Sequence, residues 1–327
     1  MPAAPAFYDA AAVDAWLDYP GCIAAMRQAM AALSASGDPQ PLRQILPLGD
    51  GRLFGVMPGS LLADCVFGAK LVSVFGDRAR PGKSRHRGVV VLFENDGDDV
   101  VAIADAEAVT RIRTACATAA ATDALARPEA TRLAIFGTGL QAQSHVEALR
   151  HVRPLSEVLL WGRRFEEAER LAGQLAAGTG LAVRAVADPR EAAQAADILC
   201  TVTGASKPVL LGDWVRPGTH VNLVGSSYLG PVEADSALVV AARYIADYRP
   251  SALAQASELA VAREAGLLTD AHVAGEIGEV FLGRLQGRQS AGEITLYKSL
   301  GHVAQDLAAV AWLHRRATGA AQNRTQP

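Results

Sequence analysis

The stretch Arg132-Leu-Ala-Ile-Phe-Gly-Thr-Gly-Leu-Gln-Ala-Gln143 decides the fold. Its apolar start predicts a short buried strand, its glycines predict a tight turn, and the residues after Ala142 have a helical pattern. Gly137 permits the turn, and Gly139 lets a phosphate approach the helix N-terminus, where free amides favour an anion. An ordinary strand-to-helix turn can contain the same motif, so the flanking sequence must show whether this turn binds a dinucleotide. The candidate cofactor-binding residues here are Gly137, Thr138, Gly139, Leu140, Gln141 and Ala142.

The chain after this motif alternates between strand and helix. Strands are predicted at 158–161, 182–186, 198–203, 220–224, 238–241 and 244–246, and helices at 165–177 and 189–196. Such an order is typical of a parallel sheet with helices on both faces. The predicted class is therefore α/β, with a Rossmann-type doubly wound parallel sheet.

The residues before the motif predict a different, α+β domain. A helical region over 8–37 is interrupted at Pro20-Gly21, and short strands follow at 42–48, 52–57, 65–74, 89–93 and 100–104, the last two joined by a turn at Asn95-Asp96-Gly97. An alanine-rich helix is predicted over 106–125, and an amphipathic helix over 299–316 is expected to return to this domain. We predict a substrate-binding and dimerisation domain from 1–118 plus 302–327, and a nucleotide-binding domain from 119–301.

Composition and charge exclude several classes of protein. Half of the 327 residues are hydrophobic, which allows a large core, and the net charge of −3 argues against a nucleic-acid or anionic-membrane surface. There is no apolar run long enough to span a membrane. The seven histidines and four cysteines show no metal-binding spacing, so we expect no metal site and reduced thiols in a cytoplasmic protein.

The tip of the second predicted strand indicates which dinucleotide binds. An acid at this position would select NAD, but the strand ends in Trp161-Gly-Arg163-Arg164. A guanidinium can pair with a ribose 2′-phosphate, which favours NADP(H) over NAD(H); the alternative is a solvated helix start. Strand ends at the same sheet edge place Thr201, Val202 and Thr203 beside the nicotinamide.

Five separate motifs together resemble the ornithine cyclodeaminase/mu-crystallin family. They are Gly68-Ala-Lys70-Leu-Val, Arg113-Thr-Ala115, the glycine turn with its Trp-Gly-Arg strand end, Val221-Asn-Leu-Val-Gly225, and Glu293-Ile-Thr-Leu-Tyr-Lys298-Ser-Leu-Gly301. The likeness runs from about residue 40 to 315. It implies a homodimer, an NAD(P)-binding second domain, and hydride transfer between the nicotinamide and an amino-acid carbon through an imine. It also implies cofactor contacts for His86, Val224, Gly225 and Lys298, although His86 lacks the small hydroxyl neighbour common in the family.

The chemistry of an imino acid suggests roles for the basic residues of the first domain. Arg113 can hold the substrate carboxylate in a two-pronged hydrogen bond, and Arg43 matches a second carboxylate-binding arginine of the family. Lys70 has apolar neighbours, so its ammonium would be partly desolvated and could polarise or protonate the imine nitrogen. Met57 matches a position that lines the substrate pocket in relatives. The alternative for each cation is a surface or salt-bridged residue, and for Met57 a core residue.

The chain departs from the cyclodeaminases at Ser227. Ornithine cyclodeaminases resemble Gly-Ala-Asp after the Val-Asn-x-Val-Gly motif, whereas this sequence has Gly225-Ser-Ser227. A serine cannot neutralise the distal ammonium of ornithine, but it can position a water or the imine nitrogen. We therefore predict an NAD(P)H-dependent reductase of a small cyclic ketimine or α-imino acid, of the pyrroline- or piperideine-2-carboxylate type. The alternatives are an ornithine cyclodeaminase, an L-amino-acid dehydrogenase, and a catalytically silent NADP-binding protein.

Overall fold

The chain divides into two compact units in this computed structural model, which describes residues 4–37, 39–61, 64–74, 86–95 and 99–319. Unit 1 comprises Met1–Arg113 with His302–Pro327, and unit 2 comprises Thr114–Gly301. Helix α3 (Ala106–Leu125) begins in unit 1 and ends in unit 2. It has the bounds predicted from the sequence. No helix within the described ranges is long and apolar enough to cross a membrane.

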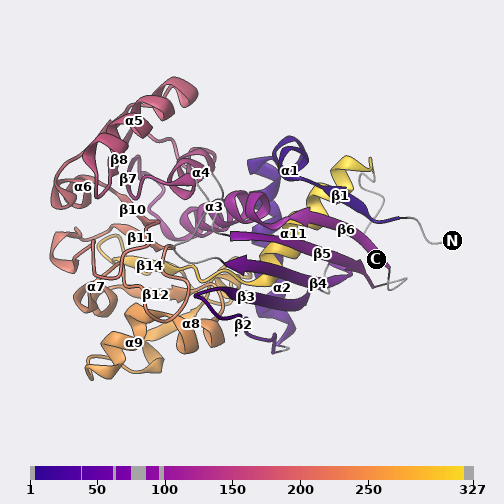
Figure 1. The fold of residues 1–327 in the computed structure, drawn as a ribbon. Coiled ribbons are helices and arrows are strands. Elements are labelled where there is room, and N and C mark those ends of the chain that lie inside the picture. Colours follow the sequence, from indigo (N-terminus) through magenta and orange to yellow (C-terminus); the bar gives the residue numbers. More distant parts are fainter. Residues whose placement is uncertain (1–3, 38, 62–63, 75–85, 96–98, 320–327) are drawn as a thin grey trace. The chain divides into compact units, whose positions relative to one another are not determined.

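Unit 1 is built on a six-stranded sheet in the order β1-β6-β5-β4-β3-β2 (Figure 1). Neighbouring strands are antiparallel except for β1 and β6, which run parallel. The strands are β1 (Ala6–Tyr8), β2 (Gln44–Pro47), β3 (Leu53–Leu61), β4 (Val66–Val74), β5 (His86–Glu94) and β6 (Val100–Asp105). The turn predicted at Asn95-Asp96-Gly97 lies mostly outside the described residues.

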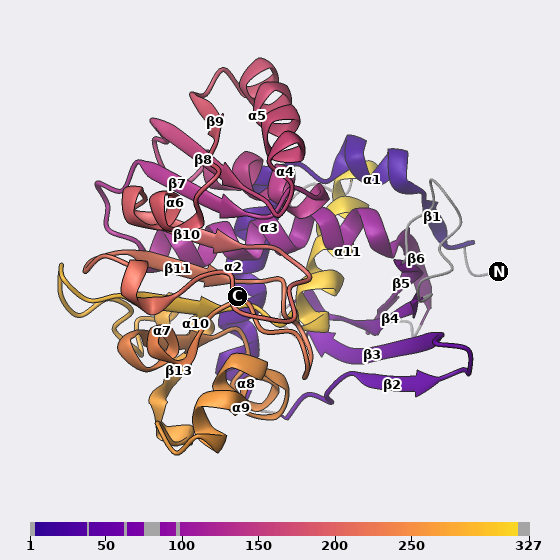
Figure 2. The same ribbon diagram turned by 60° about the vertical axis from the view of Figure 1, so that its left-hand side comes forward.

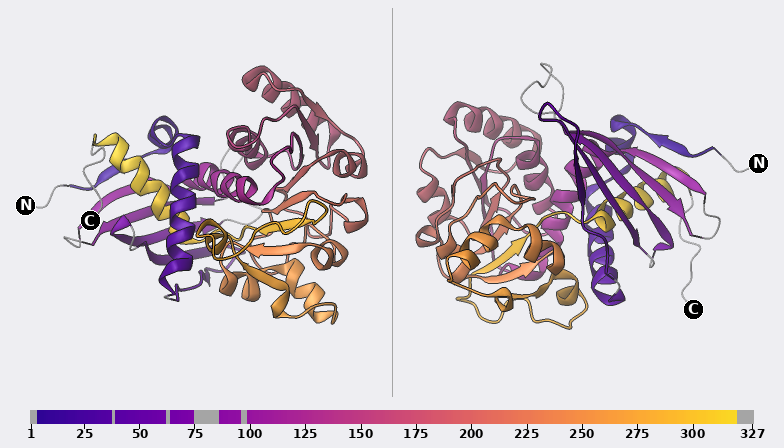
Figure 3. Two further views of the ribbon diagram at one scale, coloured as in Figure 1. Left: turned by 180° about the vertical axis from the view of Figure 1, so that it is seen from behind. Right: turned by 60° about the horizontal axis from the view of Figure 1, so that its bottom comes forward.

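Two of the helices in unit 1, α2 (Tyr19–Ser36) and α11 (Val303–Ala317), cross one face of this sheet (Figure 3, left). The helical region is interrupted as predicted, but at Leu17-Asp18 and not at Pro20-Gly21. Helix α1 (Ala10–Trp16) ends at Leu17, and the Asp18 side chain caps α2 by accepting from the Gly21 amide at 2.8 Å, so Pro20 lies in the first turn of α2, which proline tolerates. The last helix begins at Val303, four residues later than predicted.

Unit 2 contains an eight-stranded, wholly parallel sheet with helices on both sides (Figure 2). The order is β13-β12-β14-β11-β10-β7-β8-β9. Successive strands are thus added on one side of β7 up to β9 and on its other side from β10 onward, so the strand order reverses between β7 and β10. This confirms the predicted Rossmann-type fold. The strands are β7 (Arg132–Phe136), β8 (Glu157–Trp161), β9 (Val183–Ala185), β10 (Ile198–Thr201), β11 (His220–Leu223), β12 (Arg243–Ala246), β13 (Val273–Glu276) and β14 (Thr295–Lys298).

The helices of unit 2 connect these strands. They are α4 (Leu140–Leu149), α5 (Phe165–Thr179), α6 (Pro189–Ala195), α7 (Ser236–Ala241), α8 (Arg249–Gln255), α9 (Ser257–Glu264) and α10 (Ile277–Phe281). The strand predicted at 238–241 is wrong, because these residues belong to α7. Asp235 caps α7 by accepting from the Leu238 amide at 3.0 Å.

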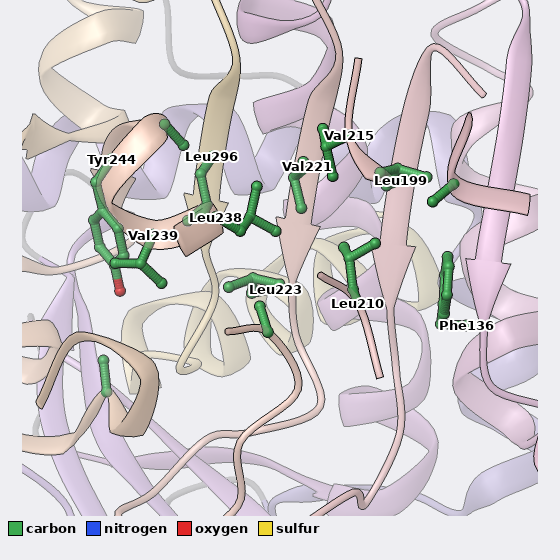
Figure 4. Packing of buried hydrophobic residues seen from close by; sticks show 14 of the residues in the cluster. Phe136, Leu199, Leu210, Val215, Val221, Leu223, Leu238, Val239, Tyr244 and Leu296 are labelled. Atoms are coloured by element: carbon green, nitrogen blue, oxygen red, sulfur yellow. The ribbon is translucent and has the colours of Figure 1, made fainter. Parts of the chain in front are cut away.

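A continuous apolar core supports one side of the central strands of unit 2 (Figure 4). Phe136, Leu199, Leu223 and Leu296 come from β7, β10, β11 and β14, and α7 contributes Leu238. Strands this deeply buried hold their carboxyl ends in fixed positions relative to one another. A doubly wound sheet binds ligands at that edge, beside the point where the strand order reverses.

Candidate functional site

Three charged side chains meet inside unit 1. Asp306 on α11 accepts hydrogen bonds at Oδ1 from Lys70 Nζ (3.2 Å) and from Arg113 Nε (2.9 Å). All three residues are buried. Because an isolated charge is costly to bury, Asp306 compensates the two cations that the sequence motifs predict for the substrate site.

Two glycines allow α11 to lie close enough to the sheet for this contact. Gly59 on β3 and Gly68 on β4 are direct cross-strand partners. A Cβ atom on Gly59 would lie 2.4 Å from Val303, and one on Gly68 would lie 3.1 Å from Leu307. A side chain at Gly59 would push against the start of α11, and one at Gly68 would first clash with Val91 O of β5, which a Cβ atom would approach to 2.0 Å.

The protonation of the cluster follows from burial and from its charges. Burial lowers the pKa of Lys70 to about 8, and the carboxylate of Asp306 opposes that shift. Burial by itself would raise the pKa of Asp306, but the charges of Arg113 and Lys70 together with their hydrogen bonds to the carboxylate hold this pKa below its usual value. At neutral pH Asp306 is ionised, while Lys70 lies close enough to its pKa to donate or accept a proton.

The side chains around Lys70 include the other residues predicted for substrate binding. Met57 is the direct cross-strand partner of Lys70, so both lie on one face of the sheet. Lys70 Nζ also donates to Thr110 Oγ1 at 2.5 Å. The positive charge of Arg43 contributes to lowering the pKa of Lys70, which places Arg43 in the same electrostatic environment.

Arg113 is oriented with part of its guanidinium engaged. Nε donates to Asp306, and Nη1 donates to Gln305 Oε1 at 2.6 Å. A guanidinium has five N–H donors. Those that have no partner among the described residues can bind a ligand carboxylate. The two acceptors fix the plane of the group, and a fixed plane suits two-pronged carboxylate binding.

The glycine turn of unit 2 has room for a phosphate. Gly137 has a φ of 136°, and a Cβ there would lie 2.9 Å from Val202, so only glycine fits. Gly139 is the N-cap of α4, where no side chain caps the helix, and a Cβ on it would meet nothing within 4 Å. These open amides at a helix N-terminus fit the pyrophosphate of a dinucleotide.

The two arginines at the end of β8 have different surroundings. Arg164 forms an ion pair with Glu167 of α5, whose carboxylate also accepts from Thr138 Oγ1 at 3.3 Å. Arg163 is exposed and forms no ion pair with the described residues. The same strand end lies against the glycine turn, because a Cβ on Gly162 would be 2.4 Å from Thr138.

The segments that follow β10 and β11 lie side by side. Thr201 pairs with Leu223 in the parallel register, and the amides of Val224 and Gly225 both donate to Thr201 O, at 3.1 and 3.2 Å. The edge therefore brings together the predicted residues Thr201, Val202, Thr203, Val224 and Gly225. Ser227 follows on the same segment and is partly exposed.

Lys298 and His86 are the remaining residues predicted to contact the cofactor. Lys298 ends β14 with its side chain fully buried, and its Nζ donates to Glu258 Oε2 at 2.9 Å and to Ser226 Oγ. Its cofactor contact stays a prediction, and its observed partners are protein groups. His86 begins β5, opposite Val74, but its side chain lies outside the described part of the structure.

Sequence reasoning missed Asp306, Gln305 and Thr110 in unit 1 and Glu233 in unit 2. Glu233 is fully buried and accepts hydrogen bonds from the segments that follow β10 and β11. Within the described residues, no group of three or more His, Cys, Asp and Glu side chains could hold a metal ion.

The chain is similar in sequence and in fold to several known proteins. A family model described as "Ornithine cyclodeaminase/mu-crystallin family" matches residues 5–321. The chain is 34% identical to the ketimine reductase mu-crystallin of Mus musculus over 271 residues, 83% of this chain and 82% of that protein. It is 35% identical to the Δ1-pyrroline-2-carboxylate reductase of Paracoccus denitrificans, over 77% of this chain and 80% of the relative. An archaeal alanine dehydrogenase dimer with bound NAD is similar in structure, with a TM-score of 0.90 and 25% identity, covering 99% of both chains.

Proposed function

The chain belongs to the ornithine cyclodeaminase/mu-crystallin family, and we propose that it reduces the C=N bond of a small cyclic ketimine or α-imino acid to give an L-amino acid. The observation that carries the proposal is the buried cluster of Lys70, Arg113 and Asp306 in unit 1. It offers one proton donor, one carboxylate-binding group and one counterion. The names of the two relatives, a ketimine reductase and a pyrroline-carboxylate reductase, agree with that chemistry.

Each site residue of unit 1 has a role in the proposed reaction. Arg113 and Arg43 bind the substrate carboxylate, which sits one bond from the C=N carbon. Lys70 donates a proton to the imine nitrogen, because its ammonium is buried and its pKa of about 8 makes proton release feasible near neutral pH. Asp306 keeps Lys70 charged before the substrate binds. Met57 lines the apolar side of the pocket.

The cofactor is a nicotinamide dinucleotide bound by unit 2. When bound, it supplies the hydride that adds to the imine carbon. The turn from Gly137 to Ala142 binds its pyrophosphate, and the segments ending at Thr203 and Gly225 flank the ring. Ser227 positions a water or the imine nitrogen. We further propose a preference for NADP(H), because Arg163 is available to a 2′-phosphate.

Replacing Arg163 by alanine is expected to weaken NADPH binding about tenfold to a hundredfold, the loss typical of one hydrogen-bonded charge pair. Binding of NADH, which lacks the 2′-phosphate, should change about threefold or less. Arg164 should contribute less than Arg163 because Glu167 already neutralises it. Dissociation constants from nicotinamide fluorescence titration test this.

The matched control for Arg163 is Arg170→Ala. Arg170 also lies on the exposed side of the α5 region but donates to Gln174 at 3.1 Å, one turn further along the helix. It should leave both dissociation constants unchanged. Equal losses for NADPH and NADH in Arg163→Ala would contradict the proposed phosphate contact.

The pH dependence of imine reduction should report Lys70. With a pKa of about 8, Lys70 is protonated below that pH and neutral above it. We expect kcat/KM for reduction to be highest below pH 8 and to fall as the pH rises through this value. The reverse oxidation needs the neutral amine and should rise over the same range. Steady-state rates in both directions test the sign, and a flat profile over about one unit on either side of the pKa would count against Lys70 as the donor.

A substrate screen tests the proposed function. Purified protein is supplied with NADPH or NADH and with pyrroline-2-carboxylate, piperideine-2-carboxylate, or pyruvate plus ammonia, and oxidation of the cofactor is followed by absorbance. Ammonia release from ornithine is measured in parallel. We expect turnover of a cyclic imine and little turnover of ornithine, since Ser227 carries no charge for the distal ammonium. Ornithine turnover at a comparable rate would overturn the proposal, and tight NADPH binding without any turnover would favour a silent binding protein.

We also propose that the protein is a homodimer that associates through unit 1. The edge strand β2 exposes about half of the surface of Ile45 and of Leu46, which are 49% and 48% exposed. Leu48, just beyond the strand, is 50% exposed. Exposed apolar side chains on an edge strand mark an interaction surface. Light scattering after size exclusion measures the oligomeric state.

A further inference from the structure

Glu233 gathers five hydrogen bonds at the carboxyl edge of the sheet in unit 2. Its Oε1 accepts from the Thr203 amide at 2.7 Å and from Thr203 Oγ1 at 2.8 Å. Its Oε2 accepts from the Gly225 amide at 2.7 Å, the Ser226 amide at 3.1 Å and Thr201 Oγ1 at 2.9 Å. One carboxylate thus joins the segment that leaves β10 to the segment that leaves β11.

A second carboxylate, that of Glu258, binds the backbone of Glu233. The Glu233 amide donates to Glu258 Oε1 at 3.0 Å, and Glu258 is ion-paired with Lys298 of β14. Ser226 Oγ donates to Glu258 Oε1 and accepts from Lys298 Nζ. Burial raises the pKa of Glu233, against the opposing charge of Lys298. Burial acts in the same direction on Glu258, but the charge of Lys298 and the hydrogen bonds from the Glu233 amide, Ser226 and Lys298 together lower its pKa. Lys298 is therefore linked to the edge through Glu258 and Ser226.

The packing around Glu233 leaves no space for adjustment. A Cβ atom on Gly225 would lie 2.1 Å from Thr203 O and 2.4 Å from Glu233 Oε1. Both glutamates and Lys298 are fully or almost fully buried. The two backbone segments are consequently held in one conformation by directional bonds to a rigid group, which is the condition for precise placement of a reacting ligand.

We propose that Glu233 is a positioning residue for hydride transfer, which fixes the Thr203 and Gly225 backbone segments against the nicotinamide ring. This rests on the proposed function, which places the ring at that edge. Glu233 acts through the two segments and does not touch the substrate. Removing its charge should therefore reduce the rate of hydride transfer more than it reduces dinucleotide affinity, which depends on the pyrophosphate turn at Gly137–Ala142.

The test is Glu233→Gln compared with Asp197→Asn. Glutamine places an NH₂ group against the amides and hydroxyls that donate to Glu233, so some of these bonds must be lost. Asp197 does similar work at the opposite end of the strands: its Oδ2 accepts from the amides of Thr131 and Arg132, at 3.1 and 3.0 Å, just before β10 begins. It is therefore a matched control, with the same change of a carboxylate to an amide in the same unit.

We expect Glu233→Gln to lower kcat for the imine about tenfold to a hundredfold, the loss that a misplacement near 1 Å produces. Its dissociation constant for NADPH should change about threefold or less. Asp197→Asn should lower the melting temperature without lowering kcat. Thr201→Val, which deletes one of the five bonds to Glu233, should give the same pattern with a smaller loss and keeps the test open if Glu233→Gln fails to fold.

Two measurements do not depend on turnover. Hydrogen exchange at the amides of Thr203, Gly225 and Ser226 should accelerate in Glu233→Gln and remain unchanged in Asp197→Asn. The emission of bound NADPH, which reports the surroundings of the nicotinamide, should change only in Glu233→Gln. Failure of the parent protein to reduce any imine would reject the proposed function but leave these two outcomes to judge Glu233. Equal effects of the two variants on kcat, exchange and emission would overturn the positioning role.

Discussion

Replacing Lys70 by methionine should lower kcat/KM for imine reduction about 10²- to 10⁴-fold, the contribution of a positioned general acid. Methionine has nearly the length of lysine and no charge, so it fills the buried site without donating a proton. Asp306 keeps its bond to Arg113 at 2.9 Å and is not left as an unpaired buried charge. The loss should appear in kcat, because the hydride still reaches the carbon while the nitrogen lacks its proton.

The matched variant for this experiment is Lys70→Arg. Arginine retains the positive charge beside Asp306 but stays protonated throughout the accessible pH range. It should fold and bind NADPH normally, remain impaired in catalysis, and lack the fall in rate near pH 8. Steady-state kinetics and NADPH titrations on the parent protein, Lys70→Met and Lys70→Arg test whether Lys70 donates the proton. A Lys70→Met enzyme within about tenfold of the parent would show that another group donates the proton.

The substitution Asp306→Asn should be the most destabilising single change in unit 1. It leaves Lys70 and Arg113, both buried, without their shared counterion, and breaking a buried ion pair by removing one partner costs about 3–5 kcal/mol. Urea denaturation measures the loss. The control is Asp64→Asn. Asp64 is a partly buried partner of Arg315, which lies on the same helix as Asp306, and its replacement should cost about 1 kcal/mol or less.

Asp306→Asn should also move the pH profile of catalysis. The carboxylate of Asp306 raises the pKa of Lys70 against the effect of burial. Its removal should therefore lower this pKa from about 8 to a smaller value. The fall in kcat/KM should therefore occur at lower pH than in the parent, whereas Asp64→Asn leaves it in place. An unshifted profile in a folded Asp306→Asn protein would show that the ion pair is structural only.

Local patterns were sufficient to predict six of the eight strands in the sheet of unit 2 and the long helix α3, whereas β13 and β14 were not predicted as strands. The glycine turn after β7 and the alternation of strand and helix follow from periodicity and backbone sterics, which act over a few residues. The run at 238–241 shows the limit of this approach. Its β-branched and apolar residues favour a strand, but the Asp235 cap and burial of Leu238 and Val239 against the sheet stabilise helix α7.

The positively charged residues of the site were predictable, and the acids that organise them were not. Lys70 and Arg113 lie within recognisable motifs. Asp306 lies 236 residues after Lys70 in an otherwise ordinary amphipathic helix, and only the close packing of α11 on Gly59 and Gly68 brings it to the lysine. Glu233 was likewise not predicted, because nothing in the nearby sequence indicates that the segments after two strands converge on it.

The descent of α11 onto the sheet of unit 1 has a consequence for how the protein folds. Unit 2 is one continuous segment, Thr114–Gly301, whereas unit 1 needs residues from both sides of it. A chain that ends at Gly301 contains all of unit 2 but lacks the helix that carries Asp306, so Lys70 and Arg113 have no shared counterion in it. Unit 2 should therefore fold without α11, whereas unit 1 should not. Pulse proteolysis of a chain truncated after Gly301 should find unit 2 resistant and the strands of unit 1 cleavable.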